Sequence, residues 1–99
     1  MSYELIFHPG ATKEYLKAYR WYEQERRGLG ERLEKMVEQR LSQIRLHPEH
    51  YRISKAPYRE VSVDVFPYTI VYKLDKKGKL ITISAVYHNK RNPRRKYRK

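Results

Sequence analysis

The spacing of hydrophobic residues changes along this chain, and the first change lies close to the N-terminus. Tyr3, Leu5 and Phe7 occupy alternate positions, which is the two-residue period of a β-strand. His8-Pro9-Gly10 interrupts this period, and proline is favoured in the first turn of a helix. Apolar residues then recur at spacings of three and four, at Ala11, Tyr15, Ala18, Tyr19 and Tyr22. The pattern predicts a strand over residues 3–7 and a helix from residue 11 to about residue 28.

A second helical pattern follows, with apolar residues at Leu33, Met36, Val37, Leu41 and Ile44. Pro48 cannot continue a helix and restricts the residue before it, so this pattern predicts an end at His47. Gly28-Leu29-Gly30 leaves only a short connection between the two helices. Short connections join antiparallel neighbours, so we expect a helical hairpin.

The period returns to two after a loop over residues 49–57. Val61, Val63 and Val65 alternate with polar residues, which predicts a strand with one apolar and one polar face. Phe66-Pro67 bends the chain, and residues 68–74 form the next expected strand. Asp75-Lys76-Lys77-Gly78 is typical of a hairpin turn. The nearly continuous apolar run over residues 80–87 predicts a central strand that is covered on both faces.

Together these elements predict the α+β class in the order β-α-α-β-β-β. The helical hairpin should pack on one face of a mostly antiparallel four-stranded sheet. A chain of 99 residues without internal repeats is typical of one domain, here spanning residues 1–99. Only a basic tail at about residues 89–99 is expected to be loosely held.

Charge adds a candidate binding surface to this fold. The chain has 23 Lys and Arg against 11 Asp and Glu, a formal net charge of +12. Its final segment, residues 88–99, contains no acidic residue. A field of this sign attracts polyanions in a salt-dependent way, and it is also compatible with a solvated tail that only aids solubility. The candidate residues for target or polyanion binding are Lys90, Arg91, Arg94, Arg95, Lys96 and Arg98.

The remaining composition excludes several classes of protein. Cysteine is absent, so neither disulfides nor thiolate metal sites are available, as is common in a reducing compartment. No apolar run is long enough to cross a membrane, and Met1-Ser2-Tyr3-Glu4-Leu5 lacks the features of a secretory signal. We therefore expect a cytoplasmic protein without membrane attachment. No metal-ligand spacing and no glycine-rich phosphate loop is present, so we expect no metal and no cofactor.

Four stretches in this order resemble the RelE/ParE family of bacterial toxins from type II toxin–antitoxin pairs. The similarity spans residues 11 to about 93, in a basic chain of matching length. The stretches are Trp21-Tyr22, Leu46-His47-Pro48, Tyr58-Arg59 with Phe66-Pro67-Tyr68-Thr69-Ile70-Val71-Tyr72, and Ala85-Val86-Tyr87-His88-Asn89-Lys90-Arg91-Asn92-Pro93. The resemblance implies a toxin, often encoded for plasmid stabilisation, that a small acidic antitoxin neutralises.

Family members act on different targets, and the resemblance implies two alternatives here. RelE-like members cleave messenger RNA on the ribosome, whereas ParE-like members poison DNA gyrase. The Phe66-Pro67-Tyr68 bend and the ending from His88 to Pro93 look ParE-like. A third interpretation, from another class, is a basic nucleic-acid-binding module without toxicity. That class usually has a basic recognition helix or exposed sheet aromatics, and neither is evident in this sequence.

The residues available for RNA cleavage separate the first two interpretations. Cleavage through the 2′-hydroxyl needs a base, an acid and cations that stabilise charge on phosphorus. Where RelE-like nucleases carry an arginine, the residue after Tyr68 here is Thr69. The candidate catalytic residues that remain are Arg59, Glu60, Tyr87, His88 and Arg91. Neighbouring strand residues point to opposite faces, so Tyr87 and His88 are not expected to share one cleft. The sequence therefore favours gyrase over the ribosome as the target.

Overall fold

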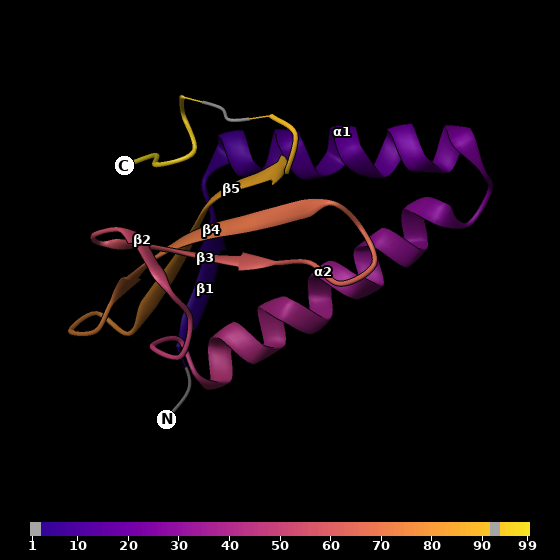
Figure 1. Ribbon diagram of the computed structural model, residues 1–99. Helices are drawn as coiled ribbons and strands as arrows, with labels where there is room; N and C mark the ends of the chain where they lie inside the picture. Colours follow the sequence, from indigo (N-terminus) through magenta and orange to yellow (C-terminus); the bar gives the residue numbers. More distant parts are fainter. Residues whose placement is uncertain (1–2, 92–93) are drawn as a thin grey trace.

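The structure, a computed structural model, describes residues 3–91 and 94–99. Its elements are β1 (Glu4–Phe7), α1 (Pro9–Glu25), α2 (Leu29–Leu46), β2 (Ile53–Lys55), β3 (Tyr58–Ser62), β4 (Tyr68–Asp75) and β5 (Leu80–His88). The strands form one sheet in the order β1-β5-β4-β3-β2, with β1 parallel to β5 and every other pair antiparallel. The α+β class and the helical hairpin on a mostly antiparallel sheet are confirmed (Figure 1).

The sheet has one strand more than the sequence predicted. β2 lies within the expected loop over residues 49–57 and pairs with β3 through an irregular register. It is only three residues long and includes Ile53, whose side chain is exposed. A strand this short has no alternation that could reveal it, because it depends on its partner for its conformation.

The two helices form a hairpin that extends beyond the sheet, toward the right in Figure 1. His8 caps α1 through its Nδ1, which accepts a hydrogen bond of 2.9 Å from the Gly10 amide. Gly28 between the helices has a φ of 89°, a conformation that favours glycine. Gly30 packs so closely on α1 that a Cβ atom would lie 2.7 Å from the Tyr19 carbonyl oxygen. Neither helix in the described part of the chain is long and apolar enough to cross a membrane.

The main core lies between the helical hairpin and one face of the sheet. Its fully buried side chains come from both layers and include Leu33, Val37, Ile44, Ile70, Tyr72, Ile81 and Ile83. The covered central strand expected over residues 80–87 is confirmed as β5, which lies between β1 and β4. Tyr72 is buried completely, and its hydroxyl donates a hydrogen bond of 2.6 Å to the Pro48 carbonyl. This bond ties β4 to the segment that follows α2.

The opposite face of the sheet is covered by the C-terminal residues. Ser84 is an additional residue in β5, because Val71 pairs with Ala85 while Tyr72 pairs with Ile83. Its hydroxyl donates to the Lys96 carbonyl at 2.7 Å and accepts from the Arg98 amide at 2.6 Å. Tyr97 packs beside a second buried cluster of Tyr58, Val71 and Ala85. Residues 96–98 are therefore packed, contrary to the prediction of a loosely held tail, whereas Arg94, Arg95 and Lys99 are exposed, and residues 92–93 lie outside the described residues.

The segment between β3 and β4 also differs from the prediction. Val61 and Val63 are buried as expected, but β3 ends at Ser62. Val65 is 67% exposed and has a φ of 73°. Phe66 takes the buried position instead. The valines alternate beyond Ser62, where the strand has already ended. The turn before Pro67 then buries Phe66 and exposes Val65.

Candidate functional site

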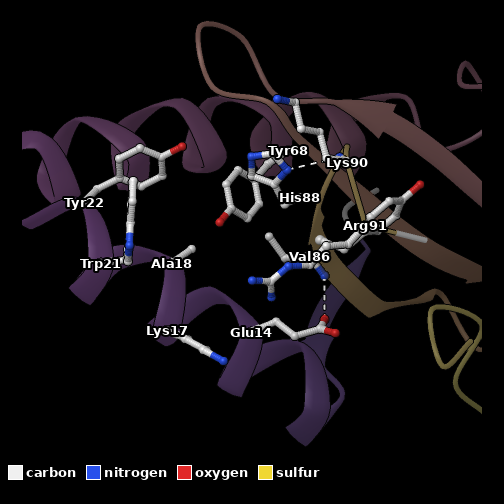
Figure 2. Close-up of a pocket in the computed structure, with 11 residues that line it drawn as sticks. Glu14, Lys17, Ala18, Trp21, Tyr22, Tyr68, Val86, His88, Lys90 and Arg91 are labelled. Carbon is white, nitrogen blue, oxygen red and sulfur yellow. Dashed lines mark hydrogen bonds between the residues drawn. The ribbon is translucent and has the colours of Figure 1, made fainter. Parts of the chain in front are cut away.

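A groove of about 520 Å³ opens between α1 and the ends of β4 and β5. Figure 2 shows its two walls, α1 on one side and β5 with the turn after it on the other. The lining residues are Glu14, Lys17, Ala18, Trp21, Tyr22, Tyr68, Val86, Tyr87, His88, Lys90 and Arg91. The five from α1 recur one helical turn apart, as Glu14, then Lys17 and Ala18, then Trp21 and Tyr22, so one face of this helix presents all of them to the groove.

Aromatic rings form a continuous row across this groove. Ring centroids are 4.9 Å apart for Trp21 and Tyr22, 6.2 Å for Tyr22 and Tyr68, and 5.2 Å for Tyr68 and His88. Each pair meets edge to face, which is a favoured geometry for aromatic side chains. Burial raises the pKa of Tyr22 and of Tyr68, so both phenols stay protonated near neutral pH. Trp21 ends the row and is 55% exposed.

Glu14 is the acidic residue that lines the groove, and its carboxylate already has hydrogen-bond partners within the fold. β1 pairs with β5 only as far as Ile83, so the Val86 amide has no β1 partner. The carboxylate of Glu14 accepts from that amide at 3.0 Å. It also accepts from both terminal nitrogens of Arg98, each at 3.1 Å. Its charge is therefore compensated, whereas the cations Lys17, Lys90 and Arg91 are exposed on the two walls.

A second polar cluster surrounds Glu60 on the sheet face away from the helices. Its carboxylate accepts from the Tyr87 hydroxyl at 3.0 Å and from the Tyr97 hydroxyl at 2.9 Å. The Lys96 ammonium lies 3.5 Å from the same carboxylate. Burial alone would raise the pKa of Glu60, but hydrogen bonds from Ser54, Tyr97 and Tyr87 and the charge of Lys96 hold it below its usual value. A carboxyl whose pKa is lowered is a weaker general base than an ordinary glutamate.

The candidate catalytic residues occupy three separate places. The Tyr87 hydroxyl contacts Glu60, whereas His88 and Arg91 line the groove, to which Tyr87 also contributes. The structure thus directs the side chains of Tyr87 and His88 to different partners, as strand alternation predicted. Arg59 donates to the carbonyls of residues 49 and 51, at 3.1 and 2.8 Å, and so supports the loop before β2.

The candidate polyanion-binding residues also divide into two groups. Lys90, Arg91, Arg94 and Arg95 are exposed. Lys96 and Arg98 instead form ion pairs with Glu60 and Glu14 inside the fold. The sequence interpretation did not distinguish these groups, because the acidic partners lie 36 and 84 positions away along the chain.

Several residues of both sites were not identified from the sequence as site residues. Trp21, Lys17 and Glu14 are spaced by four and three, so a helical projection could have placed them on one face. Tyr97 carries no comparable signal, because only the fold-back of the tail brings it to Glu60. Over residues 3–91 and 94–99 no group of three His, Asp or Glu side chains could hold a metal ion.

Comparison with known proteins shows which solved structures and which family this chain is similar to. No curated protein matches the chain. Among solved structures, a chain of the chromosomal ParDE system from P. aeruginosa has a TM-score of 0.75 and 14% identity, covering 87% of this chain and 95% of that chain. The isolated E. coli RelE toxin has a TM-score of 0.69 and 19% identity, covering 91% and 87%. A mutant E. coli RelE in the free state has a TM-score of 0.68 and 20% identity, covering 89% and 84%.

These likenesses show a shared fold. The family model described as the ParE toxin of the type II toxin–antitoxin system, parDE, matches residues 5–93. The matched part includes both helices, β2 to β5, all of β1 except Glu4, and every residue that lines the groove. This protein therefore belongs to the ParE toxin family of type II toxin–antitoxin systems.

Proposed function

We propose that this toxin acts on DNA gyrase in the cytoplasm and is not a nuclease. The observation that carries the proposal is the separation of the candidate nuclease residues. The Tyr87 hydroxyl is bonded to Glu60 on the sheet face away from the helices, whereas the His88 ring packs on Tyr68 and lines the groove with Arg91. General acid–base catalysis requires that its participants reach the same reacting atoms, and side chains directed to opposite faces of a sheet are poorly placed to do so.

The residue after Tyr68, where RelE-like nucleases carry an arginine, supports the same proposal. Thr69 follows Tyr68 on β4, and its hydroxyl donates to the Asn89 side chain at 2.6 Å. A neutral hydroxyl that already has a partner supplies no positive charge to a phosphate. Each missing charge-stabilising donor typically costs a factor on the order of 10²–10³ in rate.

The purified toxin should inhibit the supercoiling activity of gyrase and leave ribosome-bound messenger RNA intact. A supercoiling assay and primer extension on translating messages measure the two activities with the same preparation. Codon-phased cuts that disappear in His88→Ala or Arg59→Ala would overturn the proposal. Intact message together with unaffected gyrase would also contradict it.

A ribosome-dependent endoribonuclease is the second candidate, and one observation favours it. Glu60 and Tyr87 are hydrogen-bonded, and the Lys96 ammonium is within 3.5 Å of Glu60. A carboxylate, a phenol and a cation are therefore adjacent on one face of the sheet. Loss of codon-phased cuts in Glu60→Gln, with His88→Ala still active, would identify this cluster as the catalytic centre.

We also propose that a small acidic antitoxin neutralises this toxin. A net charge of +12 on 99 residues favours an acidic partner and faster association at low salt. Co-expression with the neighbouring reading frame should yield a complex. Recovery of the toxin as a free monomer from that co-expression would contradict the assignment of a partner.

A further inference from the structure

The groove beside α1 combines exposed aromatic and cationic side chains that the proposed action on gyrase does not explain. We propose that it binds single-stranded nucleic acid, with a base against Trp21 and backbone phosphates near Lys17, Lys90 and Arg91. This inference concerns direct binding by the free toxin. It goes beyond the proposed function and does not depend on whether gyrase is the target.

The aromatic row provides a surface for a base. Trp21 packs edge to face on Tyr22, with an angle of 87° between the rings, and Tyr22 is held in turn by Phe66 at 5.0 Å. This support fixes the indole while leaving 55% of the residue exposed. Stacking of bases on aromatic side chains tolerates any sequence, because every base has a π face.

Cationic side chains lie on both walls of the groove. Lys17 is one helical turn before Trp21 on α1, and Lys90 and Arg91 belong to the turn after β5. That turn is held by a hydrogen bond of 3.1 Å from the Lys90 amide to His88 Nδ1 (Figure 2). Glu14 does not cancel these charges, because Arg98 neutralises it from outside the groove. A phosphate backbone that crosses the groove would therefore meet positive charge on either side.

The composition of the lining distinguishes this ligand from an acidic peptide. Peptide helices bind by placing a continuous apolar face in a hydrophobic groove. Here the aliphatic lining consists of the small side chains of Ala18 and Val86, and rings provide the rest of the apolar surface. A volume of about 520 Å³ falls within the range of about 300–1,000 Å³ that is usual for ligand sites. The groove thus suits a short stretch of stacked bases better than an amphipathic helix.

Trp21 makes the test specific to this site, because it is the only tryptophan of the chain. Titration with a short oligothymidylate should quench its fluorescence in a saturable manner. Lys17→Gln and Arg91→Gln should each weaken binding several-fold, and each should reduce the slope of log affinity against log salt by about 0.7. The matched variants Lys35→Gln and Lys77→Gln remove exposed cations outside the groove and should leave affinity within about twofold.

A second pair of variants tests stacking. Trp21→Ala, followed by anisotropy of a labelled oligothymidylate, should weaken binding by about fivefold or more. Leu16→Ala, a change at another exposed apolar residue of α1, should have no effect. Equal affinity of the two variants would overturn the proposal. So would binding that is lost in Arg94→Gln with Arg95→Gln and retained in the groove variants. Quenching by an acidic peptide in the absence of any effect of oligothymidylate would also overturn it and indicate a peptide site.

Discussion

Glu14 and Arg98 form a bidentate ion pair between residues that are 84 positions apart in the sequence. The pair is largely buried, with side-chain exposures of 25% and 15%. The same guanidinium donates to the Ser84 carbonyl at 2.8 Å, and the Tyr58 hydroxyl donates to the Arg98 carbonyl at 2.9 Å. One residue near the C-terminus thus joins the first half of α1 to the centre of the sheet.

Arg98→Ala should therefore destabilise the protein, although the residue lies in a basic tail. Hydrogen bonds to charged groups contribute about 1.5–3 kcal/mol each, and the substitution leaves Glu14 without its counter-charge. We expect the free energy of unfolding to fall by about 2 kcal/mol, measured by urea denaturation. Lys99→Ala changes an exposed neighbour and serves as the control. Equal stability of the two variants would show that the Arg98 side chain does not contribute to the folded state.

Glu60 should make stability depend on pH in the acid range. Despite burial, hydrogen bonds from Ser54, Tyr97 and Tyr87 and the charge of Lys96 lower the pKa of this carboxyl. A group whose pKa is lower in the folded state stabilises the fold above its unfolded pKa, about 4.3 for glutamate. That contribution is lost as the pH falls through the folded pKa. Urea unfolding from pH 6 to pH 3 should show a shallower loss of stability in Glu60→Gln, and the exposed-site control Glu25→Gln should follow the unmodified protein.

The Tyr72 hydroxyl should lose its proton at a higher pH than an ordinary tyrosine, and its buried hydrogen bond should contribute measurably to the stability of the fold. Burial raises the pKa of Tyr72 to about 12. Its contribution to stability is therefore present below the ordinary pKa of about 10 and is lost as the pH rises through the folded value.

The absorbance of tyrosinate should reveal this late step, and Tyr72→Phe should reduce its amplitude by one tyrosine, because burial also raises the pKa of Tyr15. The same variant leaves the buried Pro48 carbonyl without a donor, which costs about 1–3 kcal/mol. Tyr51→Phe loses only a bond of 3.3 Å to Gln43 and should cost less. A titration curve that is unchanged in Tyr72→Phe would contradict this account.

The sequence predicted those parts of the structure that depend on local pattern. Both helices, the hairpin between them and the central strand β5 follow from spacing and from Pro48 and Gly28. The short strand β2 and the packed tail could not be predicted in this way, because both depend on partners distant in the sequence. Ser84 illustrates the difference, since only its bulge in β5 places its hydroxyl against the tail.

The site shows the same division between local and distant information. Strand alternation alone predicted that Tyr87 and His88 would separate. The network around Glu60 required the fold-back of Tyr97, whose contact with Glu60 spans 37 positions. A basic residue in this tail therefore cannot be assigned to a ligand from charge alone, because Lys96 and Arg98 serve the fold and Arg94 and Arg95 face solvent.

Val65 provides a test of strain in the turn between β3 and β4. A φ of 73° is unfavourable for a β-branched residue, by about 1–2 kcal/mol, and the side chain is 67% exposed. Glycine adopts this conformation without strain but adds entropy to the unfolded chain, which offsets roughly 0.5–1 kcal/mol of the gain. Val65→Gly should therefore raise the free energy of unfolding by about 0.5–1 kcal/mol in urea denaturation.

Val63→Gly, at a position only 5% exposed, should lower the free energy of unfolding by about 2 kcal/mol or more. A loss of stability in Val65→Gly would mean that the exposed isopropyl group stabilises the turn by more than its backbone strain costs.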